Sequence, residues 1–282
     1  MQEPSPELRV LYEEARRYEA ARDHYNAIKL YKRIAREARH WAAPYIRLGE
    51  IYKYRQEWKP ALYYNKKAVS LDAGNQWAWW NVGIAATALK KGRLARNVWA
   101  KFGQSTDEPS LGPVSVRLFC QGQFEIIWAS RLGPARALIR NIPHPRSERR
   151  YGDIVLFDHA IQGYHTSDTC RLPVFDELGL LKRSHYKTFS CVLQSPESRD
   201  IRTLRQLCRE ENLGFEVWGN ASRAFASQYF GDTPEYYFHN FELQPELQVA
   251  IAASDQEGAL GVLDSWKVIS LKGYSDFEAH RV

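Results

Sequence analysis

The chain repeats a pattern with a period of 34 residues across its N-terminal third, between Leu8 and Gly103. Alanine returns at this interval, and small, aromatic or aliphatic residues return in the same phase around it. The repeating columns are Ala27, Ala61 and Ala95; Ala15, Gly49 and Gly83; Tyr18, Tyr52 and Ala86; Tyr31, Asn65 and Trp99; and Ile34, Ala68 and Phe102. A fixed period of this length indicates stacked units that bury a continuous core between neighbours.

The pattern resembles the bacterial-type tetratricopeptide repeat, a helix-turn-helix unit of 34 residues. The middle copy fits best, and its matching residues are Leu48, Gly49, Tyr52, Ala61 and Ala68, with Tyr45 at a column that is usually aromatic. Small columns let two helix axes approach closely. Departures are Asn65, which replaces an aromatic residue, and Glu14, whose polarity is typical of a terminal repeat. The resemblance implies an α-helical solenoid over residues 1–105.

In tetratricopeptide arrays the first helix of each repeat lines a concave groove, so the resemblance also implies which residues bind a partner. They are Arg9, Tyr12 and Arg16 in the first repeat, Lys53 and Tyr54 in the second, and Trp77, Trp80, Asn81 and Ile84 in the third. Aromatic residues and Arg carry much of the energy of protein interfaces, and we therefore expect a protein or peptide partner. An alternative is that the downstream part of the chain covers these aromatic residues. Asn81 alone matches the subtype that grips a C-terminal carboxylate, so that subtype is not expected.

Charge is distributed unevenly along the chain. Residues 1–105 contain 20 Lys and Arg against 10 Asp and Glu, whereas residues 106–282 contain 19 against 23. A basic field over the repeats favours a partner with an acidic face. The alternative is that these cations only form the solvated outer faces of helices.

The middle region begins after a polar segment at 104–110 that reads as a linker. Alternation of apolar and polar residues replaces the helical period there and predicts four short strands. Their expected ranges are 114–120, 124–129, 135–140 and 153–157. We expect residues 106–185 to form a small β sheet or partly open barrel.

The C-terminal region, 186–282, contains an internal echo. Strand, helix and strand are expected at 186–193, 198–212 and 215–218, and again at 247–252, 255–269 and 275–280, with a further strand or insertion at 236–241. Two such halves predict a ferredoxin-like α/β sandwich. The expected architecture is therefore an α+β, multi-domain protein with domains at 1–105, 106–185 and 186–282.

One cluster of residues has side chains that could ligate zinc: Asp158, His159, His165, Asp168 and Cys170. It lacks the tight pairing of a closed site, so no metal and no cofactor are predicted. The favoured interpretation is a polar loop with solvent-exposed His. No local nucleophile pattern accompanies the remaining His residues, and the chain is not expected to be an enzyme. A hydrolase or metal-dependent enzyme with a site assembled in space remains the alternative.

Two functional hypotheses follow from these observations. The first is an interaction scaffold, such as an adaptor, a chaperone or an immunity-type protein, that binds its partner in the groove of the repeats. The second is a regulator whose C-terminal domain senses a small ligand or binds nucleic acid. RNA binding would require exposed aromatic residues on the sheet, for which Phe189 and the segment 236–238 are candidates, but this half is acidic, and nucleic acid is not the favoured partner.

Targeting features point to a cytoplasmic protein with no membrane association. Residues 1–6 lack the apolar core of a secretory signal, and no apolar run approaches the length of a membrane span. The four cysteines are widely spaced, so we expect buried thiols. The sequence leaves the oligomeric state open.

Overall fold

The computed structural model describes residues 4–104, 112–120, 122–166, 171–218, 227–230, 233–237 and 244–281. The chain divides into two compact units, residues 1–107 and 108–282, which are called here the helical unit and the sheet unit. A separation of 106–185 from 186–282 stays a prediction. No helix in the described residues has the length and apolar character needed to cross a membrane.

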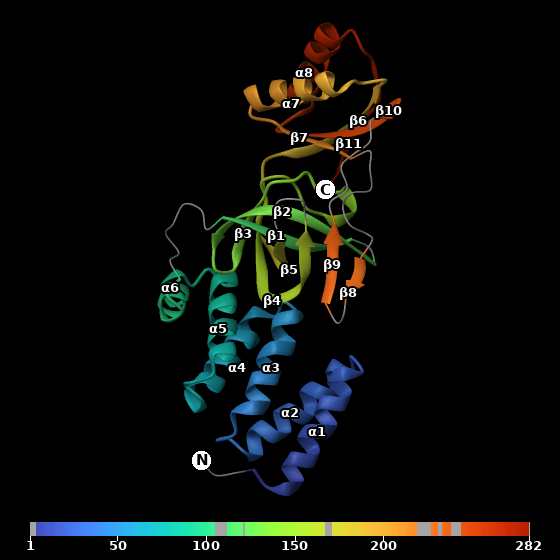
Figure 1. Cartoon of the computed structure of the whole chain (residues 1–282). Helices are drawn as coiled ribbons and strands as arrows, with labels where there is room; N and C mark the ends of the chain where they lie inside the picture. Colours follow the sequence, from blue (N-terminus) through green and yellow to red (C-terminus); the bar gives the residue numbers. More distant parts are fainter. Residues whose placement is uncertain are drawn as a thin grey trace. The chain divides into compact units, whose positions relative to one another are not determined.

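The described part of the helical unit is an array of six helices joined in pairs (Figure 1). They are α1 (Pro6–Ala20) with α2 (His24–Glu37), α3 (Ala42–Tyr54) with α4 (Trp58–Leu71), and α5 (Gln76–Ala88) with α6 (Gly92–Lys101). The helical array predicted from the 34-residue period is thus present at the level of paired helices.

The backbone repeats with the same period as the sequence. Arg22, Gln56 and Lys90 all have positive φ, at 59°, 58° and 55°, and each lies in the turn between the two helices of a pair. One left-handed residue ends the first helix and redirects the chain into the second. The alanines of the central column lie on the second helices, and all three are buried.

The small columns mark places where helices pack side chain against backbone. A Cβ atom on Gly49 would overlap the side chain of Asn65, and one on Gly83 would overlap the indole ring of Trp99. Asn65 and Trp99 occupy the same column of successive repeats, so the small residue on the first helix makes room for a larger one on the second. This contact explains why the two columns recur together.

The first sheet of the sheet unit has the strand order β3-β2-β1-β5-β4-β9-β8. Its strands are β1 (Pro113–Cys120), β2 (Gln123–Gly133), β3 (Arg136–Ile139), β4 (Ile154–Thr166), β5 (Arg171–Lys182), β8 (Ser227–Phe230) and β9 (Thr233–Tyr237). Each of the pairs β1–β2, β2–β3, β3–β4 and β4–β5 is antiparallel. Because each of these strands runs opposite to the one before it, β1 and β5 run in the same direction. The two pair in parallel, and this pairing closes the five strands into a ring.

Two of the strand predictions for the middle region were wrong in extent or number. The fourth strand was predicted to end at 157, but β4 continues to Thr166 through several register shifts that disturb its alternation. The strand β5 was not predicted, because Pro173 and the acidic pair Asp176 and Glu177 interrupt its apolar pattern. Long-range ion pairs accommodate both carboxylates: the Nε atoms of Arg117 and Arg149 lie 2.6 and 2.5 Å from Asp176 and Glu177.

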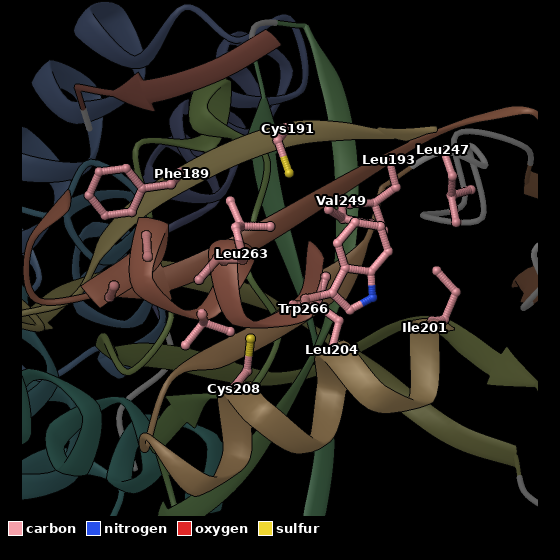
Figure 2. Packing of buried hydrophobic residues seen from close by; sticks show 14 residues of the cluster. Phe189, Cys191, Leu193, Ile201, Leu204, Cys208, Leu247, Val249, Leu263 and Trp266 are labelled. Carbon is pink, nitrogen blue, oxygen red and sulfur yellow. The ribbon is translucent and has the colours of Figure 1, made fainter. Parts of the chain in front are cut away.

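The second sheet is antiparallel, with the order β11-β6-β10-β7. Its elements are β6 (Lys187–Gln194), α7 (Ser198–Glu210), β7 (Gly214–Val217), β10 (Glu246–Ala253), α8 (Gln256–Ser270) and β11 (Tyr274–His280). Two strand-helix-strand halves therefore interleave, as the echo in the sequence predicted. Both helices cover one face of the sheet, and Figure 2 shows side chains of α7 and α8 meeting those of β6 and β10 around the indole of Trp266.

The opposite face of this second sheet packs against the segment that connects β3 to β4. Ile142 lies there with Ala250 and Ala252 of β10, together with Tyr151, Tyr186 and Trp218. Residues 236–241 were predicted to form an additional strand or part of an insertion between the two halves. Residues 236–237 end an additional strand, β9, which pairs with β4 of the first sheet. Residues 238–241 lie outside the described part of the chain.

Candidate partner-binding site

The exposed part of the predicted groove centres on two aromatic residues that lie beside a buried lysine. Tyr54, at the end of α3, is 47% exposed, and Trp77, in the first turn of α5, is 41% exposed. Lys53 is only 1% exposed, and its Nζ atom lies 4.3 Å from the ring centroid of Tyr54 and 5.9 Å from that of Trp77. A cation held between aromatic faces is electrostatically favourable and fixes the position of both rings.

Two other predicted residues are taken up by packing within the array, Ile84 completely and Trp80 in part. Ile84 is fully buried, and Trp80 packs edge-on against Trp99 and Phe102, with centroids 5.0 and 4.9 Å apart. The reason is that α5 is apolar on almost every side and has seven buried residues between Ala78 and Ala86. A groove position inferred from phase alone does not distinguish such a helix from one with a free face.

The first repeat contributes cations to the surface. Arg9 and Arg16 are exposed, and Nη1 of Arg16 lies 3.6 Å from a carboxylate oxygen of Glu13. Tyr12 is half-buried between Tyr31 and Trp41, with ring centroids 5.5 and 4.8 Å away, and burial raises its pKa. These residues extend a basic, aromatic character along the first helix of the array.

Asn81 has a different environment from the rest of the predicted set. It is 1% exposed, and neither Oδ1 nor Nδ2 has a hydrogen-bond partner in the described structure. It follows Trp77 by one helical turn, which places the two residues on the same side of α5. A buried amide without partners destabilises the fold. An apolar residue at position 81 would therefore be expected if packing were the only requirement.

A polar network between repeats was not predicted. Arg47 on α3 forms ion pairs with Glu19 on α1 and Glu50 on its own helix, at 2.5 and 2.8 Å. The hydroxyl of Tyr31 donates to Glu19 at 2.8 Å. Arg47 thus engages the carboxylates of both Glu19 and Glu50. The signal was missed because the partners lie 28 residues apart and belong to different repeats.

Three of the possible zinc ligands, Asp158, His159 and His165, lie in β4 rather than in a loop. Asp158 and His165 are almost fully buried, and the interpretation of solvent-exposed His in a polar loop is therefore wrong for the described residues. His165 Nδ1 lies 3.1 Å from the hydroxyl of Ser115, its ring packs on Trp128, and burial lowers its pKa to about 4. Asp168 and Cys170 lie outside the described residues, and no metal-binding group of three was found within them.

The second sheet does not present Phe189 as a platform for bases. Phe189 is buried in the core beneath α8 and stacks on Phe277, with centroids 5.7 Å apart. The other face of the sheet is occupied by Ile142 and Trp218. Tyr236 and Tyr237 belong to β9, of which only the backbone is described.

Comparisons with known proteins provide no family assignment. No family model matches the chain, and no curated protein matches it. Among solved structures it is similar to a hypothetical protein from Neisseria gonorrhoeae, with 15% sequence identity, a TM-score of 0.26, and coverage of 58% of this chain and 91% of that one. A TM-score this low supports no conclusion about fold or function.

Proposed function

We propose that the protein is a non-enzymatic interaction scaffold whose helical unit binds a protein or peptide partner with an acidic face. The observation that carries this proposal is the group formed by Lys53, Tyr54 and Trp77. Exposed aromatic residues held on rigid helices lose little side-chain entropy on binding, and for that reason they are effective contact residues. The exposed edges of the Tyr54 and Trp77 rings do not contribute to the core.

Charge supports an acidic partner. The repeats carry twice as many cationic as anionic residues, and Arg9 and Arg16 are exposed on α1. Carboxylates of a partner would gain ion pairs with guanidinium groups at the rim while aromatic contacts supply most of the affinity. No cofactor is part of this proposal.

The same proposal includes a finer description of the fold. We propose that the helical unit is a tetratricopeptide-type solenoid, supported by left-handed residues that recur every 34 positions between paired helices. We also propose that residues 187–280 form a ferredoxin-like sandwich, supported by the interleaved order β11-β6-β10-β7. A fold of either type is compatible with many functions, so the proposed activity depends on the aromatic group and not on the fold.

The test is affinity enrichment from cells of the source organism with the full chain and two double variants. The first variant, Tyr54→Ala with Trp77→Ala, removes the exposed rings of the proposed site. The matched control, Tyr25→Ala with Tyr63→Ala, removes two exposed rings from the second helices α2 and α4. Thermal unfolding of all three proteins checks that each is folded.

We expect proteins that are enriched by the wild type and the control to be lost with the first variant. Recovery of the same proteins, in the same amounts, by all three would rule out Tyr54 and Trp77 as the binding site. Loss with the control as well would show that binding depends on general surface apolarity.

A further inference from the structure

The outer flank of α7 carries a row of arginines. Arg202, Arg205 and Arg209 are exposed, and with Gln206 and Glu210 of the same helix they form one open patch of surface. Their spacing of three and four residues places them along one side of the helix, over roughly 10 Å from first to last. This row lies in the half of the chain whose overall balance is acidic, so it is a local concentration of cations.

Among the described residues, the arginines of this row have no carboxylate partner. Arg199, at the start of the same helix, lies 3.3 Å from Glu197 and 3.6 Å from Asp200. Glu210 is engaged by the side-chain amide of Gln206 at 2.9 Å. The guanidinium carbon of Arg205 lies 5.7 Å from the ring centroid of Phe215. Like charges three and four residues apart on a helix repel one another, and a ligand with carboxylates would relieve that repulsion.

The helix beneath the row is held rigidly. Ile201, Leu204 and Cys208 project from α7 into the core, as Figure 2 shows. The indole nitrogen of Trp266 on α8 donates to the backbone carbonyl of Asp200 at 2.8 Å. The arginines therefore extend from a fixed backbone, which reduces the entropy lost when a ligand orders their side chains.

We infer that this row is a second docking surface, and that it binds an acidic helical segment of a partner protein. Carboxylates at positions i, i+3 and i+7 of a helix repeat the spacing of Arg202, Arg205 and Arg209. Each guanidinium can donate two parallel hydrogen bonds to a carboxylate. A long polyanion such as a nucleic acid fits less well, because it would extend beyond the row across a unit with an excess of Asp and Glu.

This inference is independent of the proposed function, since it concerns another surface and needs no aromatic group. Its probe is a helical peptide of about 20 residues with Glu at i, i+3 and i+7. A second peptide has the same composition with its Glu residues distributed around the helix. Binding of each to the full chain is measured by fluorescence anisotropy at low and high salt.

The test variant is Arg202→Gln with Arg205→Gln and Arg209→Gln. Its matched control, Lys182→Gln with Lys187→Gln and Lys267→Gln, removes the same charge from exposed positions of the same unit. We expect the test variant to bind the patterned peptide about tenfold more weakly, and the control to bind as the wild type does. Binding should weaken at high salt.

Equal affinity of wild type and test variant would overturn the inference. Equal binding of both peptides would also overturn it, because affinity would then depend on the charge of the peptide and not on the spacing of its Glu residues. A single-stranded oligonucleotide that binds through the same arginines more tightly than the patterned peptide would assign the surface to nucleic acid instead. Unchanged thermal unfolding of the variants ensures that a loss of binding is not a loss of fold.

Discussion

The indole ring of Trp99 occupies the space into which any side chain on Gly83 would project. The two residues lie on α5 and α6, the helices of the third pair, and the ring is almost fully buried. The third pair is therefore held together by a contact between a ring and a backbone. Gly49 and Asn65 have the same relationship in the second pair.

Gly83→Ala should lower the free energy of unfolding by about 1–3 kcal/mol, because the indole and its neighbours must shift. Helix propensity acts in the other direction, since Ala favours a helix interior over Gly by about 1 kcal/mol. Chemical denaturation of the full chain measures the net effect. Gly92→Ala is the control, because a Cβ atom there would meet only the flexible end of Arg96, at 3.5 Å. A stabilised Gly83→Ala protein would contradict the packing described here.

Leu271→Gly should raise the free energy of unfolding by about 1 kcal/mol. Leu271 ends α8 with a left-handed backbone, at φ 57°, and its side chain is 88% exposed. Glycine would relieve the strain and remove little buried surface. Leu271→Ala is the matched control, because it keeps the Cβ atom and should leave stability nearly unchanged. Equal effects of the two substitutions would show that strain at this residue is not the cause.

Glu216→Ala should destabilise the sheet unit by about 2–3 kcal/mol. The carboxylate of Glu216 on β7 accepts hydrogen bonds from Nδ2 of Asn141 at 2.7 Å and from the backbone nitrogen of Ile142 at 2.6 Å. Alanine leaves both donors without that acceptor, whereas Glu216→Gln keeps one oxygen and should cost less. A double-mutant cycle with Asn141→Ala measures the coupling, and strict additivity would contradict the contact.

Stability of the sheet unit should fall as pH falls from about 6.5 to 4. Burial lowers the pKa of His165 from 6.5 to about 4 in the folded protein. In that window the unfolded chain binds a proton at this residue and the folded chain does not, so acid favours unfolding. The neutral ring contributes fully above pH 6.5. Denaturation at several pH values should show a shallower pH dependence for His165→Gln, and identical slopes would contradict the assignment.

Cys191 and Cys208 should resist thiol reagents in the folded protein. Burial raises the pKa of both thiols to about 12, and Figure 2 shows them within the core between the sheet and its helices. The thiolate is the reactive form, and it is scarce at pH 8. A Cys120→Ser, Cys170→Ser protein isolates the pair. It should react only after denaturant is added, and rapid reaction of the native protein would contradict this prediction.

Most elements of the fold could be predicted from local patterns in the sequence. The 34-residue period predicted the paired helices because each column is repeated and each contact is short in sequence. The strand-helix-strand echo predicted the elements of the second sheet for a similar reason. The strand β5 was missed because Asp176 and Glu177 are stabilised by arginines 59 and 28 residues away. No window along the chain contains that information.

The candidate site was less predictable. Phase within the repeat predicted both Trp77 and Trp80 as groove residues. In the structure Trp77 is exposed, whereas Trp80 packs beside Trp99. The difference arises from the packing of α5 against α6, which depends on side-chain volume on both helices. The arginine row on α7 was visible as a spacing in the sequence. Its freedom from ion pairs with described residues required the structure.

The parallel pairing of β1 with β5 sets the order in which the ring is completed. During synthesis β1 leaves the ribosome long before Asp176, the partner of Arg117, has been made. Until β5 is made, both outer strands of the nascent meander, β1 and β4, lack the neighbour that it will provide, and such edges can pair with other chains. We expect truncation before residue 171 to give an aggregating product, because the ring is finished by its last strand.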